Sequence, residues 1–160
     1  MSVRSLCAVL ALAICLPAAA AEAPMHSQFL PPDDAGLREG AAEQQQLLQV
    51  TEYSVVLGTQ RQSNQQPIPI TTPALLRLKG KPLSKGTDVR QVLVGFDAEG
   101  KSLKKPNYDE KTRTLSLYYP LSAYPQLLDL LRNGTVYCQF LSYPNGHIWA
   151  DLHTGAVRAR

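Results

Sequence analysis

Residues 136–153 read VYCQFLSYPNGHIWADLH and decide how the C-terminal part of the chain folds. Two stretches rich in strand-forming residues flank the turn signal Tyr-Pro-Asn-Gly-His at residues 143–147, which predicts a β-hairpin. A two-residue loop and a three-residue loop both fit this turn. They differ by one residue in register, and such a slip moves every side chain of a strand to the other face of the sheet.

The hydrophobic pattern favours the three-residue loop over residues 144–146. In that register one face of the hairpin is uniformly apolar, whereas the two-residue loop mixes polar and apolar residues on both faces. Pro144 suits the first central position of a type I turn, and Gly146 suits the left-handed position after it. Cys138 then pairs with Leu152, and we expect a buried core thiol there rather than a nucleophile.

The opposite face of the hairpin collects polar and aromatic side chains. His147, Asp151 and His153 point to the same side of one strand, where neighbours two apart lie about 7 Å from each other. Asp151 and His153 can share a metal ion or pair as carboxylate and imidazole. Tyrosine and tryptophan also dominate recognition surfaces. A third interpretation is that a loop or the N-terminal arm covers this face. The candidate binding residues are Tyr137, Tyr143, His147, Trp149, Asp151 and His153.

Upstream of the hairpin, the pattern predicts one helix and several strands. Leucines at 127, 128, 130 and 131 form the apolar stripe of a helix between Pro125 and Gly134. Alternation and β-branched residues predict strands at 47–57, 74–79, 89–96 and 112–119, with a return strand at 102–105 after a turn at 97–100. We therefore expect an α+β fold: a small, mostly antiparallel β-sheet with one helix packed on a face, closing in a C-terminal β-hairpin.

The N-terminus has the three parts of a cleavable signal peptide. Arg4 supplies the positive charge, residues 5–16 are apolar, and small residues follow Pro17, with cleavage expected after Ala21. The apolar stretch is shorter than the roughly 20 residues that cross a bilayer, so we expect no transmembrane anchor after cleavage. The predicted organisation is a signal peptide at 1–21, a mobile arm with room for a short helix at 22–46, and a single α+β domain at 47–160. The predicted location is periplasmic or secreted.

Cysteine content and motif searches narrow the chemistry. Cleavage removes Cys7 and Cys15, and the single remaining Cys138 excludes an intramolecular disulfide. The chain has no phosphate-binding glycine loop, no paired-cysteine zinc spacing and no nucleophile elbow, so we expect no cofactor. A net charge of only +3 on an exported chain argues against nucleic-acid binding.

Positive charge is concentrated between residues 77 and 113. It suggests an acidic partner, although lysines that keep strand edges soluble would give the same pattern. The proline-bearing stretch 59–73 is either a connecting loop or a binding loop. The residues of the candidate basic patch are Lys79, Lys81, Lys85, Lys101, Lys104 and Lys105.

These features predict an exported, non-enzymatic binding protein, such as an inhibitor or an immunity-type partner of another envelope or secreted protein. One alternative is a metal-binding protein or small hydrolase that uses His147, Asp151 and His153. The other is a structural component of an envelope or secretion assembly, which would self-associate.

Overall fold

The structure is a computed structural model that describes residues 26–58, 73–83 and 86–155. The predicted signal peptide, most of the 59–73 loop and Lys85 lie outside the described residues. The elements are the 3-10 helices η1 (Ser27–Phe29), η2 (Pro32–Leu37) and η3 (Leu121–Ala123), the helix α1 (Tyr124–Asn133), and the strands β1 (Gln44–Leu57), β2 (Ala74–Pro82), β3 (Gln91–Asp97), β4 (Asn107–Asp109), β5 (Thr114–Pro120), β6 (Val136–Ser142) and β7 (Ile148–Thr154).

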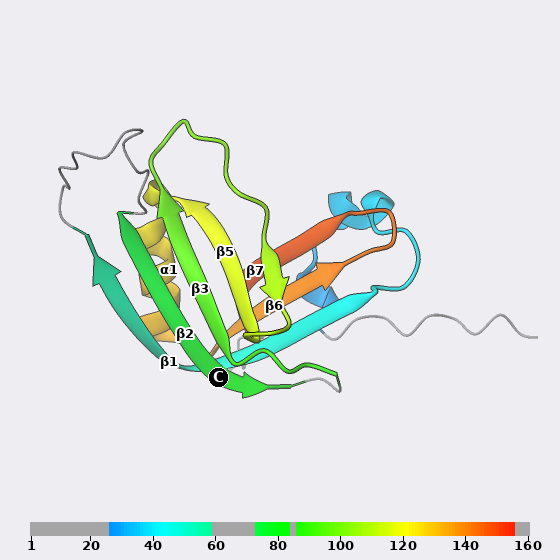
Figure 1. The fold of residues 1–160 in the computed structure, drawn as a ribbon, viewed down its shortest axis with the longest axis horizontal. Coiled ribbons are helices and arrows are strands. Elements are labelled where there is room, and N and C mark those ends of the chain that lie inside the picture. The colour runs from blue at the N-terminus through cyan, green and yellow to red at the C-terminus, as the bar shows by residue number, and fades with distance from the viewer. Residues whose placement is uncertain (1–25, 59–72, 84–85, 156–160) are drawn as a thin grey trace, which may run out of the picture.

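The strands form one mixed sheet that curls into a half-barrel (Figure 1). Its order is β4-β5-β3-β2-β1-β6-β7, and β3 and β5 are the parallel pair. The long strand β1 belongs to both halves of the sheet. Gln44–Gln49 pairs with β6, whereas Leu48–Leu57 pairs with β2. The sheet therefore changes direction along β1.

A glycine permits this change of direction. The β1–β2 register shifts between Val50 and Glu52, and Gly80 of β2 lies opposite Val50. A Cβ atom at position 80 would lie only 1.9 Å from the backbone oxygen of Gln49. Close backbone approach at an irregularity is a typical reason for glycine inside a strand, because any side chain would push the two strands apart.

The expectation of a small, mostly antiparallel sheet is wrong. The sheet has seven strands, is mixed and is strongly curled. Residues 102–105 do not form the predicted strand next to β3. Their one apolar side chain, Leu103, is not buried in the core and stays exposed. Leu115 and Leu117 of β5 occupy that place instead, fully buried beside β3. The chain reaches β5 through β4, a strand absent from the sequence prediction, and this long crossover makes the pairing parallel.

Two groups of apolar side chains hold the elements together. The main core fills the concave side of the sheet, where Leu127 of α1 is buried and Tyr124 meets Phe96 edge-on at 5.1 Å. A smaller core on the other side of β6 and β7 contains Leu30 and Leu141. The N-terminal segment supplies Leu30, so this segment covers the outer face of the hairpin. The predicted arm ends earlier than expected, since β1 already begins at Gln44.

The C-terminal hairpin confirms the predicted three-residue register. Cys138 pairs with Leu152, and the Tyr143 N–H donates to the His147 carbonyl at 2.9 Å. Gly146 has φ 81°, the left-handed conformation expected of it. Cys138 is a free thiol with 1% of its surface exposed, and burial raises its pKa above the ordinary value. Of the described residues, no helix combines the length and apolar character needed to cross a membrane.

Candidate functional site

The outer face of the hairpin binds the chain's own N-terminal segment, His26–Leu37. Leu30 is buried against Leu141 and Tyr143, and Trp149 packs half-buried on the same cluster. Phe29 stacks on the His153 ring with centroids 4.2 Å apart and planes 24° from parallel. The predicted binding residues are thus gathered on one face, and the structure places a segment of the same chain on them.

A chain of hydrogen bonds ties this segment to β7. His26 Nδ1 lies 2.9 Å from His153 Nε2, and His153 Nδ1 lies 2.5 Å from Asp151 Oδ1. The Trp149 indole N–H donates to the other oxygen of Asp151. Both ring nitrogens of His153 are therefore engaged. Burial and the neighbouring His153 lower the pKa of His26, while Asp151 opposes the shift.

His147 lies at a separate contact with the N-terminal segment. Its Nε2 is 2.9 Å from Asp34 Oδ1, and the other oxygen of Asp34 lies 3.5 Å from the Arg38 guanidinium. The structure therefore joins Asp151 to His153 but gives His147 a different partner. Within residues 26–58, 73–83 and 86–155, no three His, Cys, Asp or Glu side chains are placed to hold a metal ion. The metal-site alternative gains no support from this geometry.

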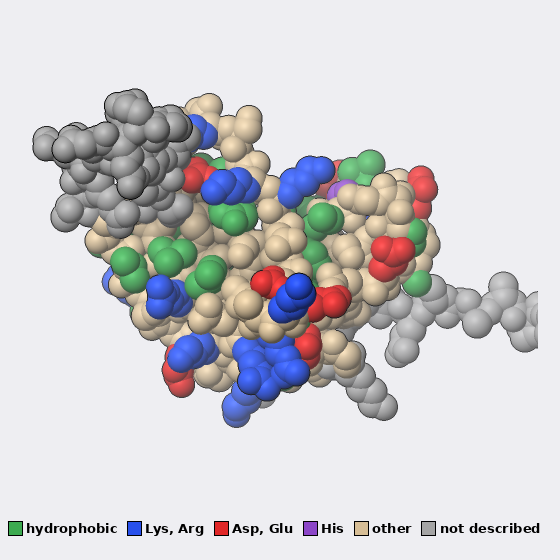
Figure 2. All heavy atoms as spheres, viewed as in Figure 1, with side chains coloured by type: hydrophobic (Ala, Val, Ile, Leu, Met, Phe, Trp, Pro, Cys, Tyr) green, Lys and Arg blue, Asp and Glu red, His purple; other side chains and the backbone are tan. Residues whose placement is uncertain are grey.

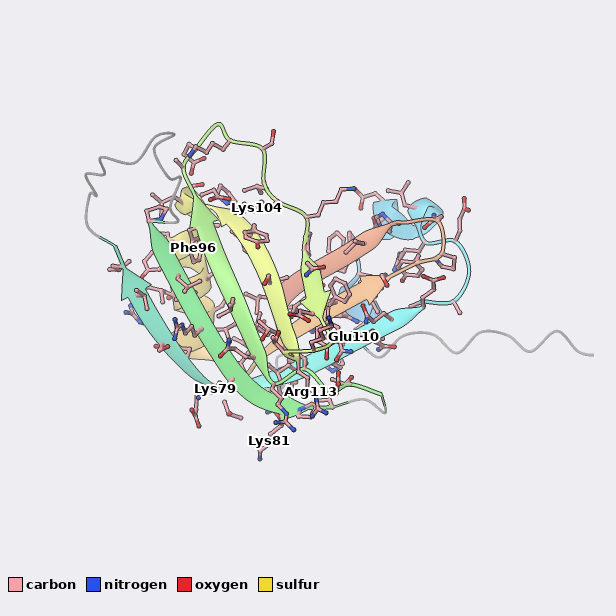
Figure 3. All side chains as sticks on the ribbon, viewed as in Figure 1. Lys79, Lys81, Phe96, Lys104, Glu110 and Arg113 are labelled. Carbon is pink, nitrogen blue, oxygen red and sulfur yellow. The ribbon has the colours of Figure 1, made fainter. Side chains whose placement is uncertain are left out.

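The described lysines of the predicted basic patch fall into two groups, as the positions of Lys79, Lys81 and Lys104 in Figure 3 show. Lys79 and Lys81 lie on β2, beside the start of β3. Lys101, Lys104 and Lys105 lie in the connection after the end of β3, where the Lys104 ammonium sits 5.2 Å from the centre of the Tyr118 ring. A seven-residue strand separates the two groups by about 20 Å. Lys79 and Lys81 are therefore not joined to Lys101, Lys104 and Lys105 in one patch.

A cleft of about 900 Å³ opens between the first half of β1 and the β4–β5 hairpin. In Figure 2, acidic and basic side chains lie side by side in the lower centre of the molecule, where Figure 3 labels Glu110 and Arg113. The lining is polar, with carboxylates, amides and one guanidinium. The residues that line it are Ala42, Glu43, Gln44, Gln45, Gln46, Gly86, Asp88, Tyr108, Glu110, Arg113 and Ser142.

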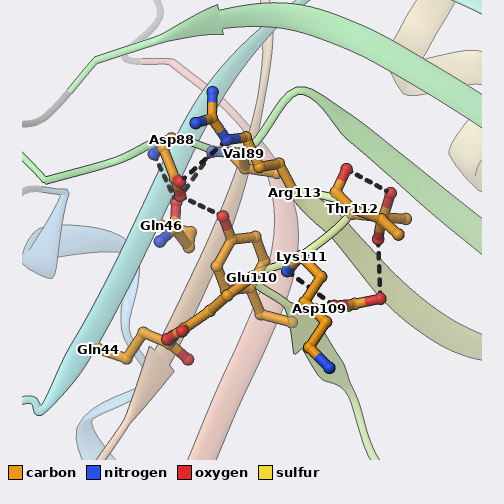
Figure 4. Close-up of polar contacts among 11 residues, drawn as sticks. Gln44, Gln46, Asp88, Val89, Asp109, Glu110, Lys111, Thr112 and Arg113 are labelled. Carbon is orange, nitrogen blue, oxygen red and sulfur yellow. Dashed lines mark hydrogen bonds and ion pairs between the residues drawn. The ribbon is translucent and has the colours of Figure 1, made fainter.

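Hydrogen bonds fix the inner wall of this cleft (Figure 4). The buried Gln46 side chain accepts from the backbone N–H groups of Asp88 and Val89, at 3.1 and 3.2 Å. The Tyr108 hydroxyl donates to the Asp88 carboxylate. Burial and this bond raise the pKa of Tyr108, which keeps its hydroxyl protonated as a donor. These bonds connect the side chains of the inner wall to one another and to the backbone.

The outer rim of the cleft uses two further contacts. Arg113 Nε lies 3.4 Å from Asp88 Oδ2, and the Gln44 side-chain amide donates to Glu110 Oε1 at 3.0 Å. Glu110 and Arg113 belong to the turn between β4 and β5, whereas Gln44 lies at the start of β1. The rim thus brings a residue of the interior strand β1 next to the turn between the edge strand β4 and its neighbour β5.

Arg113 has an unusual backbone conformation for its side chain. Its φ is 54°, in the left-handed region that favours glycine. Its carbonyl accepts from the Arg90 N–H at 2.9 Å, so the turn holds this conformation in place. A non-glycine residue there costs roughly 1–3 kcal/mol, while an exposed ion pair such as Arg113–Asp88 returns less than about 1 kcal/mol. Stability alone does not account for arginine at this position.

Sequence reasoning did not find the cleft. Its side chains come from three separate stretches, around residues 42–46, 86–88 and 108–113, and no motif links them. One signal was present: Gln44, Gln45 and Gln46 directly precede two leucines of a strand. Buried amides need hydrogen-bond partners, so a run of glutamines entering a strand indicates a polar site nearby.

The chain matches no protein-family model, no curated protein and no solved structure.

Proposed function

We propose that this chain is a non-enzymatic binding protein that recognises another exported protein through the polar cleft between β1 and the β4–β5 hairpin. The observation that carries the proposal is the ordering of the cleft by its own hydrogen bonds. Gln46, Asp88 and Tyr108 form a connected network on the inner wall. A surface that is already ordered loses little conformational freedom on binding, which favours affinity.

The charge of the lining defines the kind of segment that fits. The lining contains three carboxylates, Glu43, Asp88 and Glu110, and one guanidinium, Arg113, so it carries a formal charge of −2. A partner segment with a lysine or arginine at its centre complements this charge. Complementary charge speeds association and excludes unsuitable partners more than it adds affinity. An inhibitor or immunity-type protein works by this kind of stable recognition.

The cleft offers a more accessible surface than the hairpin face. The N-terminal segment already covers Trp149 and His153, and its removal would expose the apolar side chains of the smaller core. The cleft is open and needs no such rearrangement. The two surfaces therefore make different predictions for variants.

Affinity capture of the purified chain from an envelope extract of its own source, read by mass spectrometry, tests the proposal. Glu110→Lys reverses a charge in the cleft lining, and Glu39→Lys makes the same charge change at an exposed position outside the lining. We expect one dominant partner with the wild type and Glu39→Lys, and its loss with Glu110→Lys. Re-measuring that purified partner by titration at two salt concentrations shows whether charge complementarity contributes.

Trp149→Ala separates the two candidate surfaces in the same experiment. A partner that is lost with Trp149→Ala but kept with Glu110→Lys would move recognition to the hairpin face and refute the role of the cleft. Absence of a specific partner in every sample would remove the support for a binding protein altogether.

A further inference from the structure

The second half of β1 is an open edge of the sheet. Strand β6 pairs with β1 only up to Gln49, so residues 50–57 are paired with β2 alone among the described residues. Figure 1 shows this part of β1 as the outermost strand on its side of the sheet. An open edge presents unpaired backbone N–H and C=O groups, which other strands readily join.

One backbone hydrogen bond at the end of β1 identifies which backbone groups point outward. The Gly58 N–H donates to the Pro73 carbonyl at 2.8 Å, so Gly58 and Pro73 form a hydrogen-bonded pair. Bonded and non-bonded pairs alternate along an antiparallel ladder. The N–H and C=O groups of Tyr53, Val55 and Leu57 therefore face away from β2.

This edge is also unusually apolar. The exposed fractions are 41% for Tyr53, 39% for Val55, 48% for Val56 and 64% for Leu57. Natural edge strands carry lysine, proline or inward charges that prevent pairing. Residues 50–57 contain no lysine and no proline, and Glu52 is their one charged residue. The register shift near Glu52 protects only the start of this stretch.

We infer that two copies of this chain pair through this edge, antiparallel and with Val55 on the two-fold axis. In that register Val55 lies opposite its own copy, and Tyr53 lies opposite Leu57 of the second copy. These are the residues with outward backbone groups, so both strands satisfy their hydrogen bonds with each other. A two-fold interface requires such a self-complementary patch.

Side chains and charge fit the same register. It pairs valine with valine and tyrosine with leucine on one face, combinations that stabilise neighbouring strands. Glu52 lies opposite Gly58 of the second copy, so no like charges meet. The pairing joins two seven-stranded sheets into one continuous sheet, and it does not use the cleft between β1 and β4–β5. Self-association would also suit a component of an envelope assembly.

Molar mass from light scattering after size-exclusion chromatography, over a wide range of concentrations, tests this inference. We expect a dimer whose population rises with concentration. Val55→Pro removes an outward N–H that β2 does not use, and proline is tolerated at such edge positions. This variant should weaken dimerisation by at least about tenfold while its far-ultraviolet circular dichroism stays that of the wild type, whereas Val55→Thr should still dimerise.

Cysteine cross-linking checks the register independently of stability. Opposed residues of a bonded pair have Cα atoms about 5.5 Å apart, within disulfide range, so Val55→Cys should form a cross-linked dimer on mild oxidation. Val56→Cys pairs with Ser54 of the second copy and lies too far from its own copy to cross-link efficiently. Cys7 and Cys15 are replaced by serine in this assay, and the remaining native Cys138 is buried and should not interfere.

A wild type that is monomeric at every concentration would overturn the inference and leave the edge open to a strand of a different protein. Dimerisation that Val55→Pro does not weaken would place the interface elsewhere. Equal cross-linking at positions 55 and 56 would indicate random collision and would refute the register.

Discussion

Replacement of Gly80 by alanine should destabilise this protein more than any ordinary substitution on the sheet surface. The added Cβ would lie 1.9 Å from the Gln49 oxygen and 2.7 Å from its carbonyl carbon, whereas real contacts of this kind lie beyond 3.0 Å. The strands must therefore separate by about 1 Å. The obstructing atoms belong to the backbone of β1, so no side-chain rotation relieves the contact.

The size of the effect follows from this geometry. Overpacking costs typically 1–3 kcal/mol, and rigid backbone obstruction places Gly80→Ala at about 3 kcal/mol. That is a large part of the 5–15 kcal/mol that holds an average domain together, and it corresponds to a melting temperature lower by roughly 10 °C. Gly80 lies where the sheet changes direction, so its replacement should weaken the pairing of β1 with both β2 and β6.

Urea denaturation followed by circular dichroism measures this loss. Gly36→Ala is the matched control, because a Cβ at that position meets nothing within 4 Å and the backbone is not left-handed. We expect the control to unfold at a midpoint close to that of the wild type. A Gly80→Ala midpoint equally close to the wild type, with an unchanged slope, would refute the argument that close backbone approach at Gly80 permits the curl of the sheet.

Three further outcomes follow from other parts of the structure. In the same denaturation assay, Arg113→Gly should be more stable than Arg113→Ala by about 1 kcal/mol, because glycine adopts the left-handed backbone without strain. Equal stabilities of the two variants would show that the turn is not strained. Packing of the N-terminal segment against the hairpin lowers the pKa of His26, so His26 binds a proton more readily when this segment is released. Binding of the segment to the hairpin should therefore weaken as the pH falls below about 6.5. The fluorescence of Trp149, the one tryptophan in the chain, should shift in that window in the wild type and stay flat in His26→Gln, and an identical shift in both would exclude His26 as the cause. The Cys138 thiol should resist a thiol reagent in the folded protein and react fully in urea, whereas rapid reaction without denaturant would contradict its burial.

The hairpin shows how much local sequence can determine. Its register, its loop length and the burial of Cys138 all follow from the alternation of residues 136–153 and from the chemistry of one turn. The helix at 124–133 follows in the same way from its leucine spacing. Each of these features depends on residues that are close along the chain, so the pattern alone contains the information.

The arrangement of the strands did not follow from the sequence. A segment such as 102–105 has an acceptable strand pattern, but Leu115 and Leu117 bury far more apolar surface beside β3 and so exclude it. The parallel pair, the short strand β4 and the curl at Gly80 depend on contacts between distant segments. The strand propensity of a segment depends on that segment alone. It does not indicate which of two segments will pair with a given strand.

The hairpin face and the cleft also differ in how far the sequence predicts them. Alternation along a strand is a local property, so the pattern of residues 136–153 already predicts a shared face for Tyr137, Trp149, Asp151 and His153. Contacts between distant segments place residues 26–37 over that face and bring Gln46, Asp88 and Tyr108 together in a cleft. The physical reason is that burial and hydrogen-bond satisfaction depend on which distant groups come within a few ångströms, and the fold as a whole sets those distances.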